Sequence, residues 1–380
     1  MQKKRMRILI YGHTHYTPTG FGKVTRYVTE HLMKKHQVFM APVVLAPPAI
    51  IDVAGITVLP MPGNLVDTPY WVVYWVRELQ IDLVIQHFDV WMLKENWIKD
   101  IDCPVVTYAP VDGDRLPLNF VDSCQGAHTN IAMSKWAKTC FDRAYIPNIY
   151  IPHGVNLDVF KPGQEKIIED KFVIGMVVTN GSIRKNIAGQ MQAFAEFAYG
   201  KPDVVLMMHT QVKKVTHESV NIVGLAHDLG IEDKVVFTDT DQYAIGVSEE
   251  YLAHFYCTCD VLLQCTLGEG FGLPIIEAQA CGVPVIATET EVMSEIVGDG
   301  GDLIYGNNIM FSYNMVNMIL PWKHAIIDSL YDYYNDMVCM EESKKDAIEN
   351  AQQYSWQNIY PLWDKLIGEI NGKTSSTSNL

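Results

Sequence analysis

The chain of 380 residues carries 44 acidic side chains against 29 lysines and arginines, a net charge of −15 at pH 7. This balance argues against a nucleic-acid partner, which calls for a basic face, and against tight binding to anionic lipid. Hydrophobic residues make up 48% of the chain and charged ones 19%, so we expect two domains with a core in each.

No apolar run reaches the roughly 18 residues that a transmembrane helix needs, and no secretory signal precedes the first expected strand. The eight cysteines are scattered and do not resemble a secreted disulfide framework. Cys257 and Cys259 form one C-x-C, for which we expect buried thiols rather than a metal site. These features predict a cytoplasmic protein.

Short apolar runs alternate with helical patterns through the first half of the chain. Continuous apolar strands separated by helices are typical of a parallel sheet that is covered on both faces. The expected strands are 6–12, 38–45, 83–87, 105–108 and 130–133, and the expected helices are 21–36, 70–79 and 135–143.

The segment 70–75, with the sequence YWVVYW, has the most unusual local composition in the chain. Tyr70 and Tyr74, like Trp71 and Trp75, are four residues apart and therefore neighbours on a helix surface. We expect core packing for these rings, with acceptor docking and weak membrane contact as the alternatives.

Turn signals at 151–154 and 161–163 separate this half from a second alternating region. Its expected strands are 172–178, 204–209, 235–238, 261–264 and 283–287, and a mostly helical stretch from 328 to 370 breaks near 354–355. The predicted organisation is an N-terminal Rossmann-like domain (1–160), a C-terminal one (161–353), a C-terminal helix crossing back to the first domain (354–371) and a disordered tail (372–380).

The strongest motif is GEGFGLPIIE at 268–277, which follows an expected strand and opens a helix. Pro274 suits the first helical turn, where its missing N–H costs nothing. Glycines at 268, 270 and 272 allow the backbone to turn tightly and to approach a ligand. The free N–H groups of the first turn, aided by the helix dipole, predict a diphosphate site.

Two carboxylates beside a phosphate site make sense if they face hydroxyl groups. Glu277 lies about five residues into the helix, or roughly 7 Å along its axis, which is a suitable displacement from diphosphate to ribose. Glu269 precedes the helix and is expected to face the other direction, toward a sugar attached to the diphosphate, through charge-assisted hydrogen bonds. The alternative is that Glu269 is a loop acid and Glu277 an exposed helix residue.

A second motif, VVTNGSIRKN at 177–186, runs from a strand end into a helix. Lys185 is expected to neutralise the charge that grows on a departing diphosphate. Asn180 and Arg184 are further candidates for binding the same group. The alternative for Lys185 and Arg184 is ordinary surface charge.

Two more candidates follow strands of the first domain. In PTGFG at 18–22, Gly20, Phe21 and Gly22 are candidates because they follow the first expected strand, although such glycines often serve packing alone. In YAPVDG at 108–113, Asp112 is expected to act on the hydroxyl group of a second substrate, either by taking its proton or by orienting the group. The alternative is a simple turn role.

The 268–277 motif, with Thr266 before it and Glu295 ahead of GDGG at 298–301, resembles the retaining glycosyltransferases of family 4. Their signature is two glutamates eight positions apart; the resemblance is specific over about 172–305 and weaker over 6–160. It implies the α/β GT-B fold, with two Rossmann-like domains whose parallel sheets face a central cleft. The resemblance also implies roles for the candidate residues. Glu277 would bind the donor ribose, Glu269 the sugar, and the amides of Phe271, Gly272 and Leu273 phosphate and sugar. The loop with Gly20, Phe21 and Gly22 would face the donor diphosphate.

Two positions depart from the family pattern. The arginine that the family places about five residues before the lysine is replaced by Asn180, which weakens the diphosphate clamp unless Arg184 substitutes for it. The strand end where relatives often carry a histidine holds Ala109 and Pro110.

The implied activity is the transfer of a hexose-type sugar from a UDP- or GDP-sugar to an acceptor hydroxyl, with retention of anomeric configuration and without a metal or cofactor. Positioning and leaving-group stabilisation would supply the catalysis. The acceptor (carbohydrate, glycan, lipid or protein) and a homo-oligomeric state are left open. The alternatives are a nucleotide-sugar epimerase of similar fold and a catalytically inactive nucleotide-sugar-binding homologue; a dehydrogenase is disfavoured because the first glycine motif lacks its third glycine.

Overall fold

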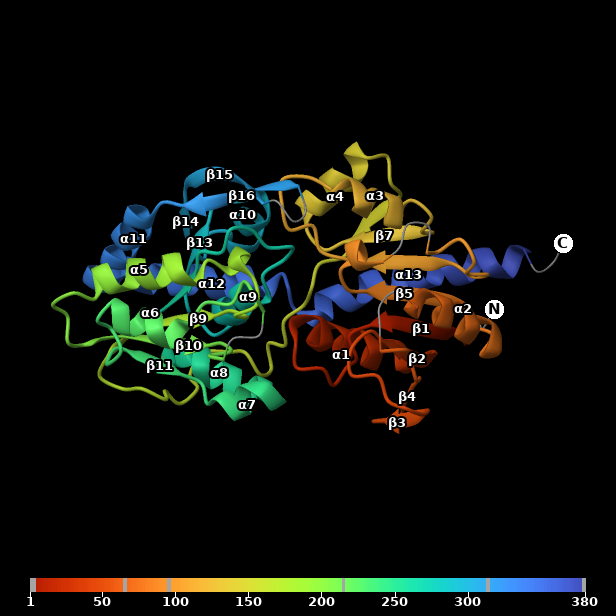
Figure 1. Cartoon of the computed structure of the whole chain (residues 1–380), viewed down its shortest axis with the longest axis horizontal. Helices are drawn as coiled ribbons and strands as arrows, with labels where there is room; N and C mark the ends of the chain where they lie inside the picture. Colours follow the sequence, from red (N-terminus) through yellow and green to blue (C-terminus); the bar gives the residue numbers. More distant parts are fainter. Residues whose placement is uncertain (1–4, 64–66, 94–96, 214–215, 312–314, 378–380) are drawn as a thin grey trace. The chain divides into compact units, whose positions relative to one another are not determined.

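The computed structural model describes residues 5–63, 67–93, 97–213, 216–311 and 315–377 (Figure 1). The chain divides into two compact units. Unit 1 contains the chain up to Val111, the segment Arg115–Gly154 and the chain from Trp356 onward; unit 2 contains Asp112–Asp114 and Val155–Ser355. The division therefore falls at 154/155 rather than at 160/161, and a three-residue segment of the expected first domain belongs to unit 2.

The sheet of unit 1 has eight strands in the order β3-β4-β2-β1-β5-β6-β7-β8. All neighbours pair in parallel except β3 and β4, which form an antiparallel pair at one edge. The expected strands are confirmed, whereas β3, β4 and β8 were missed because three residues are too few to show a pattern. The strands are β1 (Arg7–Gly12), β2 (Gln37–Pro42), β3 (Ile51–Val53), β4 (Ile56–Val58), β5 (Leu83–His87), β6 (Val105–Tyr108), β7 (Thr129–Ala132) and β8 (Asn148–Tyr150).

Helices cover this sheet, and its central strands β5 and β6 are buried along their whole length, as expected for a parallel sheet with two covered faces. The helices of unit 1 are α1 (Gly20–Met33), α2 (Thr68–Glu78), the short 3₁₀ helix η1 (Val90–Met92), α3 (Leu118–Cys124), α4 (Lys135–Arg143) and α13 (Trp356–Thr377).

The C-terminal helix α13 packs on α1 within unit 1, as the sequence predicted. The ring of Trp356 stacks on that of Tyr27 with centroids 4.9 Å apart, and Oδ2 of Asp364 lies 2.7 Å from Nζ of Lys35. The helix continues to Thr377, beyond residue 372 where a disordered tail was expected to begin. Residues 378–380 lie outside the described residues.

The prediction of core packing for the aromatic rings of α2 is wrong for three of the four. Trp75 is buried at 7% exposure, whereas Tyr70, Trp71 and Tyr74 are 76%, 37% and 46% exposed. The helix buries Val72 and Trp75 on one face, and its period of 3.6 residues leaves the other three rings toward solvent. Acceptor docking and membrane contact stay open as interpretations of the exposed rings.

Close packing at the start of α1 requires a glycine at position 22. Thr19 caps the helix, its Oγ1 accepting a hydrogen bond from the Gly22 amide at 3.1 Å. A Cβ atom on Gly22 would lie 2.0 Å from the carbonyl oxygen of Thr17. This close backbone approach requires glycine at 22, whatever ligand contact the residue makes.

The main sheet of unit 2 has six parallel strands in the order β11-β10-β9-β12-β13-β14, and β15 and β16 form a separate antiparallel hairpin. The expected strands are confirmed; β14 and the hairpin were missed. The strands are β9 (Phe172–Val177), β10 (Val204–His209), β11 (Val235–Phe237), β12 (Val261–Gln264), β13 (Val285–Thr288), β14 (Gly301–Ile304), β15 (Gly306–Phe311) and β16 (Val316–Pro321).

One core cluster of unit 2 lies between this sheet and the packed helices α5 and α11. In the described parts of the chain, no helix combines the length and the apolar character that crossing a membrane requires. The helices of unit 2 are the 3₁₀ helix η2 (Ile183–Lys185), α5 (Ile187–Phe197), α6 (Ile222–Asp228), α7 (Thr240–Ile245), α8 (Glu249–Thr258), α9 (Leu273–Ala280), α10 (Glu291–Val297), α11 (Lys323–Asn335) and α12 (Met337–Gln352).

Replacing Gly22 with alanine should destabilise the protein by about 1–3 kcal/mol, because the added methyl group must displace a backbone carbonyl. Urea unfolding measures the loss. Gly126→Ala is the matched control, since its Cβ would meet Ile98 at an ordinary 3.6 Å. Equal unfolding midpoints for the two variants would show that the close approach at Gly22 does not constrain the fold.

Candidate functional site

The candidate site lies in unit 2, beyond the carboxyl ends of β9 and β12. The order of the strands reverses between these two neighbours, since β9 leads to β10 on one side and the later strands lie on the other. Open α/β sheets bind ligands at such a switch point. Arg184 and Lys185 follow β9, and Glu269 follows β12, so the fold brings two distant sequence motifs together.

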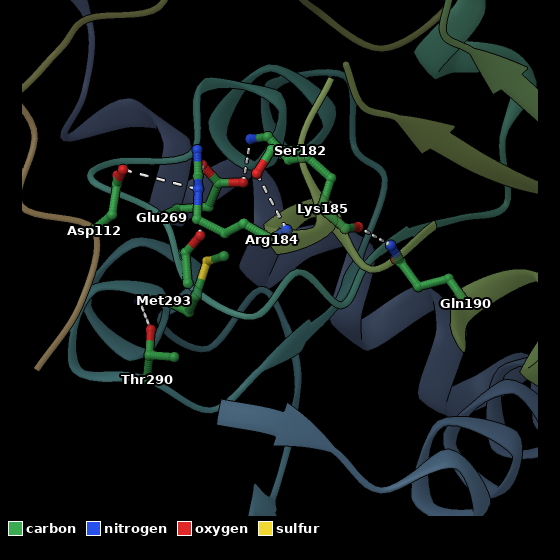
Figure 2. A network of polar contacts seen from close by, with 9 residues as sticks. Asp112, Ser182, Arg184, Lys185, Gln190, Glu269, Thr290 and Met293 are labelled. Atoms are coloured by element: carbon green, nitrogen blue, oxygen red, sulfur yellow. Dashed lines mark hydrogen bonds and ion pairs between the residues drawn. The ribbon is translucent and has the colours of Figure 1, made fainter. Parts of the chain in front are cut away.

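The carboxylate of Glu269 contacts both cations (Figure 2). Oε1 lies 2.6 Å from Nζ of Lys185, and Oε2 lies 2.9 Å from Nη1 of Arg184. The side chains are only 9% exposed for Glu269 and 18% for each cation. Nε of Arg184 also lies 3.8 Å from Oδ2 of Asp112, so the predicted catalytic residues Glu269, Lys185 and Asp112 belong to one charged cluster.

The electrostatics of this cluster depend on the carboxylate. Burial acts to raise the pKa of Glu269, but the charges of Lys185 and Arg184 and their hydrogen bonds lower it to about 2. Burial lowers the pKa of Lys185, and the positive charge of Arg184 lowers it further, while Glu269 opposes both effects. The ionised carboxylate thus keeps two like charges side by side.

Backbone contacts hold the two site segments together. The carbonyl of Arg184 accepts a hydrogen bond from the Leu267 amide at 2.8 Å, and its guanidinium donates to the Gly268 carbonyl. Nδ2 of Asn186, just before α5, donates to the carbonyl of Cys265 at 2.9 Å. The cationic turn and the glycine loop are therefore joined within the protein itself.

Helix α9 begins in the way that the motif predicted. Gly272 is its N-cap with φ of +95°, a conformation that side-chain-bearing residues rarely adopt. Because the cap is glycine, no capping side chain is bonded to the first-turn N–H groups in the described structure. Such a helix start suits an anion. Phe271, before it, is buried with its ring edge-on to Tyr354 at 5.8 Å, which anchors the backbone that leads into Leu273.

Glu277 is buried at 4% exposure, so the alternative of an exposed helix residue is wrong. The hydroxyl of Tyr256 on α8 donates a hydrogen bond to its Oε2 at 2.9 Å. This bond orients the carboxylate between α8 and α9. Its contact with a ribose stays a prediction.

Asn180 has a structural partner that the sequence did not reveal. Its Nδ2 donates to the carbonyl of Val220, and its Oδ1 accepts from the Val220 amide, both at 2.9 Å. The two ends of the amide thus bind one loop residue, which competes with the predicted diphosphate contact. It is Arg184, not Asn180, that lies beside Lys185 and bonds to the same carboxylate.

Asp112 joins unit 2 because its neighbour Asp114 is fastened to the β15–β16 hairpin. Oδ1 and Oδ2 of Asp114 accept from the backbone and side-chain amides of Asn317 at 2.8 and 3.0 Å, and the Asp114 amide donates to the Asn317 carbonyl at 3.2 Å. A Cβ on Gly268 would lie 2.4 Å from the carbonyl oxygen of Asp112. The first glycine of the motif therefore lets segment 112–114 lie against the loop.

The predicted diphosphate-facing residues of unit 1 lie at the start of α1. Gly20 and Gly22 flank Phe21, whose ring stacks on His13 with centroids 5.2 Å apart and meets His87 edge-on at 5.3 Å. Burial lowers the pKa of His13 to about 4. The contact of this segment with a donor diphosphate stays a prediction.

His87, at the carboxyl end of β5, is a buried histidine that the sequence analysis did not single out. Its Nδ1 lies 2.9 Å from Oγ1 of Thr25 and its ring stacks on Tyr108 at 4.7 Å, while the Tyr108 hydroxyl bonds to His153. Burial, followed by the influence of His153 and His13, holds the pKa of His87 well below its usual value. The available signal was a polar Gln-His pair ending an apolar strand, one strand away from Ala109.

Comparison with solved structures identifies the fold. The structure of sucrose-phosphate synthase from Thermosynechococcus elongatus aligns with a TM-score of 0.78 and 18% sequence identity. The alignment covers 97% of this chain and 100% of the synthase chain. HepE from Anabaena, solved in complex with UDP and glucose, matches 96% of this chain over 100% of its own, with a TM-score of 0.73 and 17% identity. The fold is GT-B, with two Rossmann-like domains, as predicted.

Sequence comparison adds a match to one family model. Residues 159–312, less than half of the chain, match the model of glycosyl transferases group 1. The D-inositol 3-phosphate glycosyltransferase of Mycobacterium leprae (strain TN) is 26% identical over 316 residues, 73% of this chain and 66% of the relative. That of Paenarthrobacter aurescens (strain TC1) is 28% identical over 217 residues, 54% of this chain and 48% of the relative. The chain thus spans about half to two thirds of the length of these relatives.

Glu269→Gln should remove part of the acid dependence of stability. Because the pKa of Glu269 falls from an ordinary 4.5 to about 2 in the folded protein, its ionised form contributes stability above about pH 4.5 that is lost as the pH falls toward about 2. Calorimetry over this interval should show a flatter decline of Tm in the variant. Glu232→Gln, at an exposed position, should follow the wild type; an unchanged slope in Glu269→Gln contradicts the ion-pair account.

Proposed function

We propose that this protein transfers a sugar from a nucleoside diphosphate sugar to an acceptor hydroxyl group. The observation that carries this proposal is the pair Lys185 and Arg184, held by Glu269 at the switch point of the sheet from which α9 begins. Two cations and a glycine-capped helix start form a suitable site for two phosphate groups. Similarity to curated glycosyltransferases, and to HepE solved with UDP and glucose, supports the proposal.

The proposed roles follow from where the charges lie. The first-turn N–H groups of α9 bind the diphosphate, and Lys185 and Arg184 neutralise the charge that develops as it leaves. One preorganised donor at such a position is typically worth about 2.7–4 kcal/mol of transition-state stabilisation. The family's arginine position holds Asn180 in this chain, so Arg184 supplies the second positive charge for the diphosphate.

Glu269 changes partners in this scheme. When phosphate oxygens take over the two cations, the carboxylate is released to accept hydrogen bonds from hydroxyls of the donor sugar. Glu277, held by Tyr256, accepts from the ribose hydroxyls. Asp112 orients the acceptor hydroxyl or takes its proton, next to the leaving-group charges through its contact with Arg184.

The finer assignments are also part of the proposal. Retention and a hexose-type sugar follow from the resemblance to family 4, and UDP is favoured over GDP because HepE was solved with UDP. Two side chains supply the positive charge for the leaving group, so the scheme includes no metal ion and no resident cofactor. The acceptor, a homo-oligomeric state and a cytoplasmic location stay predictions.

A thermal-shift screen of UDP, GDP and ADP should show the largest rise in Tm with UDP. A ligand at 100 times its Kd stabilises the native state by about 2.7 kcal/mol. Glu277→Ala should reduce the shift, because it removes the proposed ribose contact, while Glu232→Ala should keep it. Absence of a shift with all three nucleotides counts against the proposal.

Lys185→Ala and Arg184→Ala should each lower the rate of UDP release from UDP-glucose by about 100-fold, since each removes one charge from the leaving-group site. The assay contains EDTA, because the scheme needs no metal, and NMR of the transferred sugar reports its anomeric configuration. Lys138→Ala, which breaks an exposed pair with Asp142, is the control.

The same assay distinguishes the alternatives. Conversion of the donor sugar to its epimer without release of UDP would indicate an epimerase. Nucleotide binding with no turnover in the presence of a panel of acceptors would indicate an inactive homologue. Either result contradicts the proposed transfer.

A further inference from the structure

Two cysteines on neighbouring helices of unit 2 lie outside the charged cluster. Cys257 is in the last turn of α8, and Cys281 is the C-cap of α9. The two side chains are close enough for each to shift the pKa of the other thiol. The expectation that Cys257 and Cys259 are both buried thiols is wrong for Cys257, which is partly exposed.

Further contacts define where the two sulfur atoms lie. Sγ of Cys281 donates to the carbonyl of Ala253 at 3.9 Å, one turn before Cys257 and therefore on the same face of α8. Sγ of Cys257 donates to the carbonyl of Lys161 at 3.4 Å, and Cys281 approaches the same carbonyl. Both thiols are thus confined to one small region between α8, α9 and residue 161.

The two thiols differ in the way that an oxidisable pair requires. The contact with Cys281, opposed by burial, lowers the pKa of Cys257 to about 7, so a substantial fraction is thiolate near neutral pH. The same contact, together with burial, raises the pKa of Cys281. Cys257 is suited to attack an oxidant, and the buried Cys281 to react with the product.

We propose that Cys257 and Cys281 form a reversible disulfide in response to peroxides, and that this bond weakens the binding of nucleotide at α9. The Cys257 thiolate attacks one peroxide oxygen; the O–O bond breaks, and a sulfenic acid and one water result. The Cys281 sulfur then attacks the Cys257 sulfur, and the hydroxyl group leaves as a second water. Two thiols and one hydrogen peroxide thus give one disulfide and two waters, and a dithiol reductant reverses the oxidation.

The disulfide is coupled to the candidate site through Tyr256, the residue before Cys257. Tyr256 donates its hydroxyl to Glu277 at 2.9 Å, and Glu277 lies on α9 one turn before Cys281. Disulfide sulfurs are about 2.05 Å apart, closer than two sulfur atoms that are not bonded. Formation of the bond therefore draws the side chains of Cys257 and Cys281 together, next to the Tyr256–Glu277 hydrogen bond between α8 and α9. This coupling rests on the proposed function, because it assumes that α9 and Glu277 bind the nucleotide.

The test uses the full chain, first reduced and then treated with hydrogen peroxide. Alkylation and peptide mass spectrometry should show the loss of two alkylatable thiols and a peptide linked through Cys257 and Cys281. Cys257→Ser and Cys281→Ser should each abolish the linkage. Cys103→Ser and Cys339→Ser, which change the other partly exposed cysteines, should leave it intact.

UDP titration of the same samples measures the coupling. The oxidised wild type should bind UDP about fivefold more weakly than the reduced protein, and dithiothreitol should restore the affinity. Cys257→Ser should bind UDP equally well before and after peroxide treatment.

The outcomes separate the two ideas. Absence of the 257–281 linkage in the peroxide-treated wild type overturns the disulfide, whatever the protein's activity. A linkage that leaves UDP affinity unchanged overturns the coupling to α9. If the folded, reduced protein binds no nucleoside diphosphate, the proposed function and the coupling both fail, and the mass of the linked peptide alone decides the disulfide.

Discussion

The carboxylate of Glu269 is the group on which the arrangement of the candidate site depends. It lets Lys185 and Arg184 lie next to each other in a region where burial already lowers the pKa of the lysine. Buried ion pairs are a poor source of stability, because desolvation offsets much of the attraction. Under the proposed function the cluster is a preorganised site for anions, in which the protein supplies a carboxylate until a ligand supplies phosphate oxygens.

The fold places the charged cluster where two segments from opposite sides of the sheet reversal meet. The turn after β9 and the loop after β12 are joined by a main-chain hydrogen bond between Arg184 and Leu267 and by a bond from the Asn186 side chain to the Cys265 carbonyl. The position of the cationic turn is therefore set in part by hydrogen bonds to main-chain groups. Preorganisation of this kind is what electrostatic stabilisation of a leaving group requires.

The sequence was sufficient for features that depend on local pattern. Strands such as β5, β10 and β12 were predicted with correct bounds because each is a continuous apolar run with a turn beside it, and the glycine motif predicted the start of α9. Contacts between distant segments were not predictable. Nothing local indicates that Asn180 pairs with Val220, or which face of α2 is buried when apolar residues occupy both.

Unit 2 is not a single stretch of chain, and this limits how the protein can be dissected. The peptide Asp112–Asp114 lies against Gly268 and the β15–β16 hairpin, held by the three hydrogen bonds between Asp114 and Asn317. A recombinant fragment spanning only 155–355 would lack this peptide and expose the groups of Asn317 that it satisfies. A fragment meant to reproduce unit 2 therefore needs residues 112–114 restored, for example by a circularly permuted gene that carries them on a short linker.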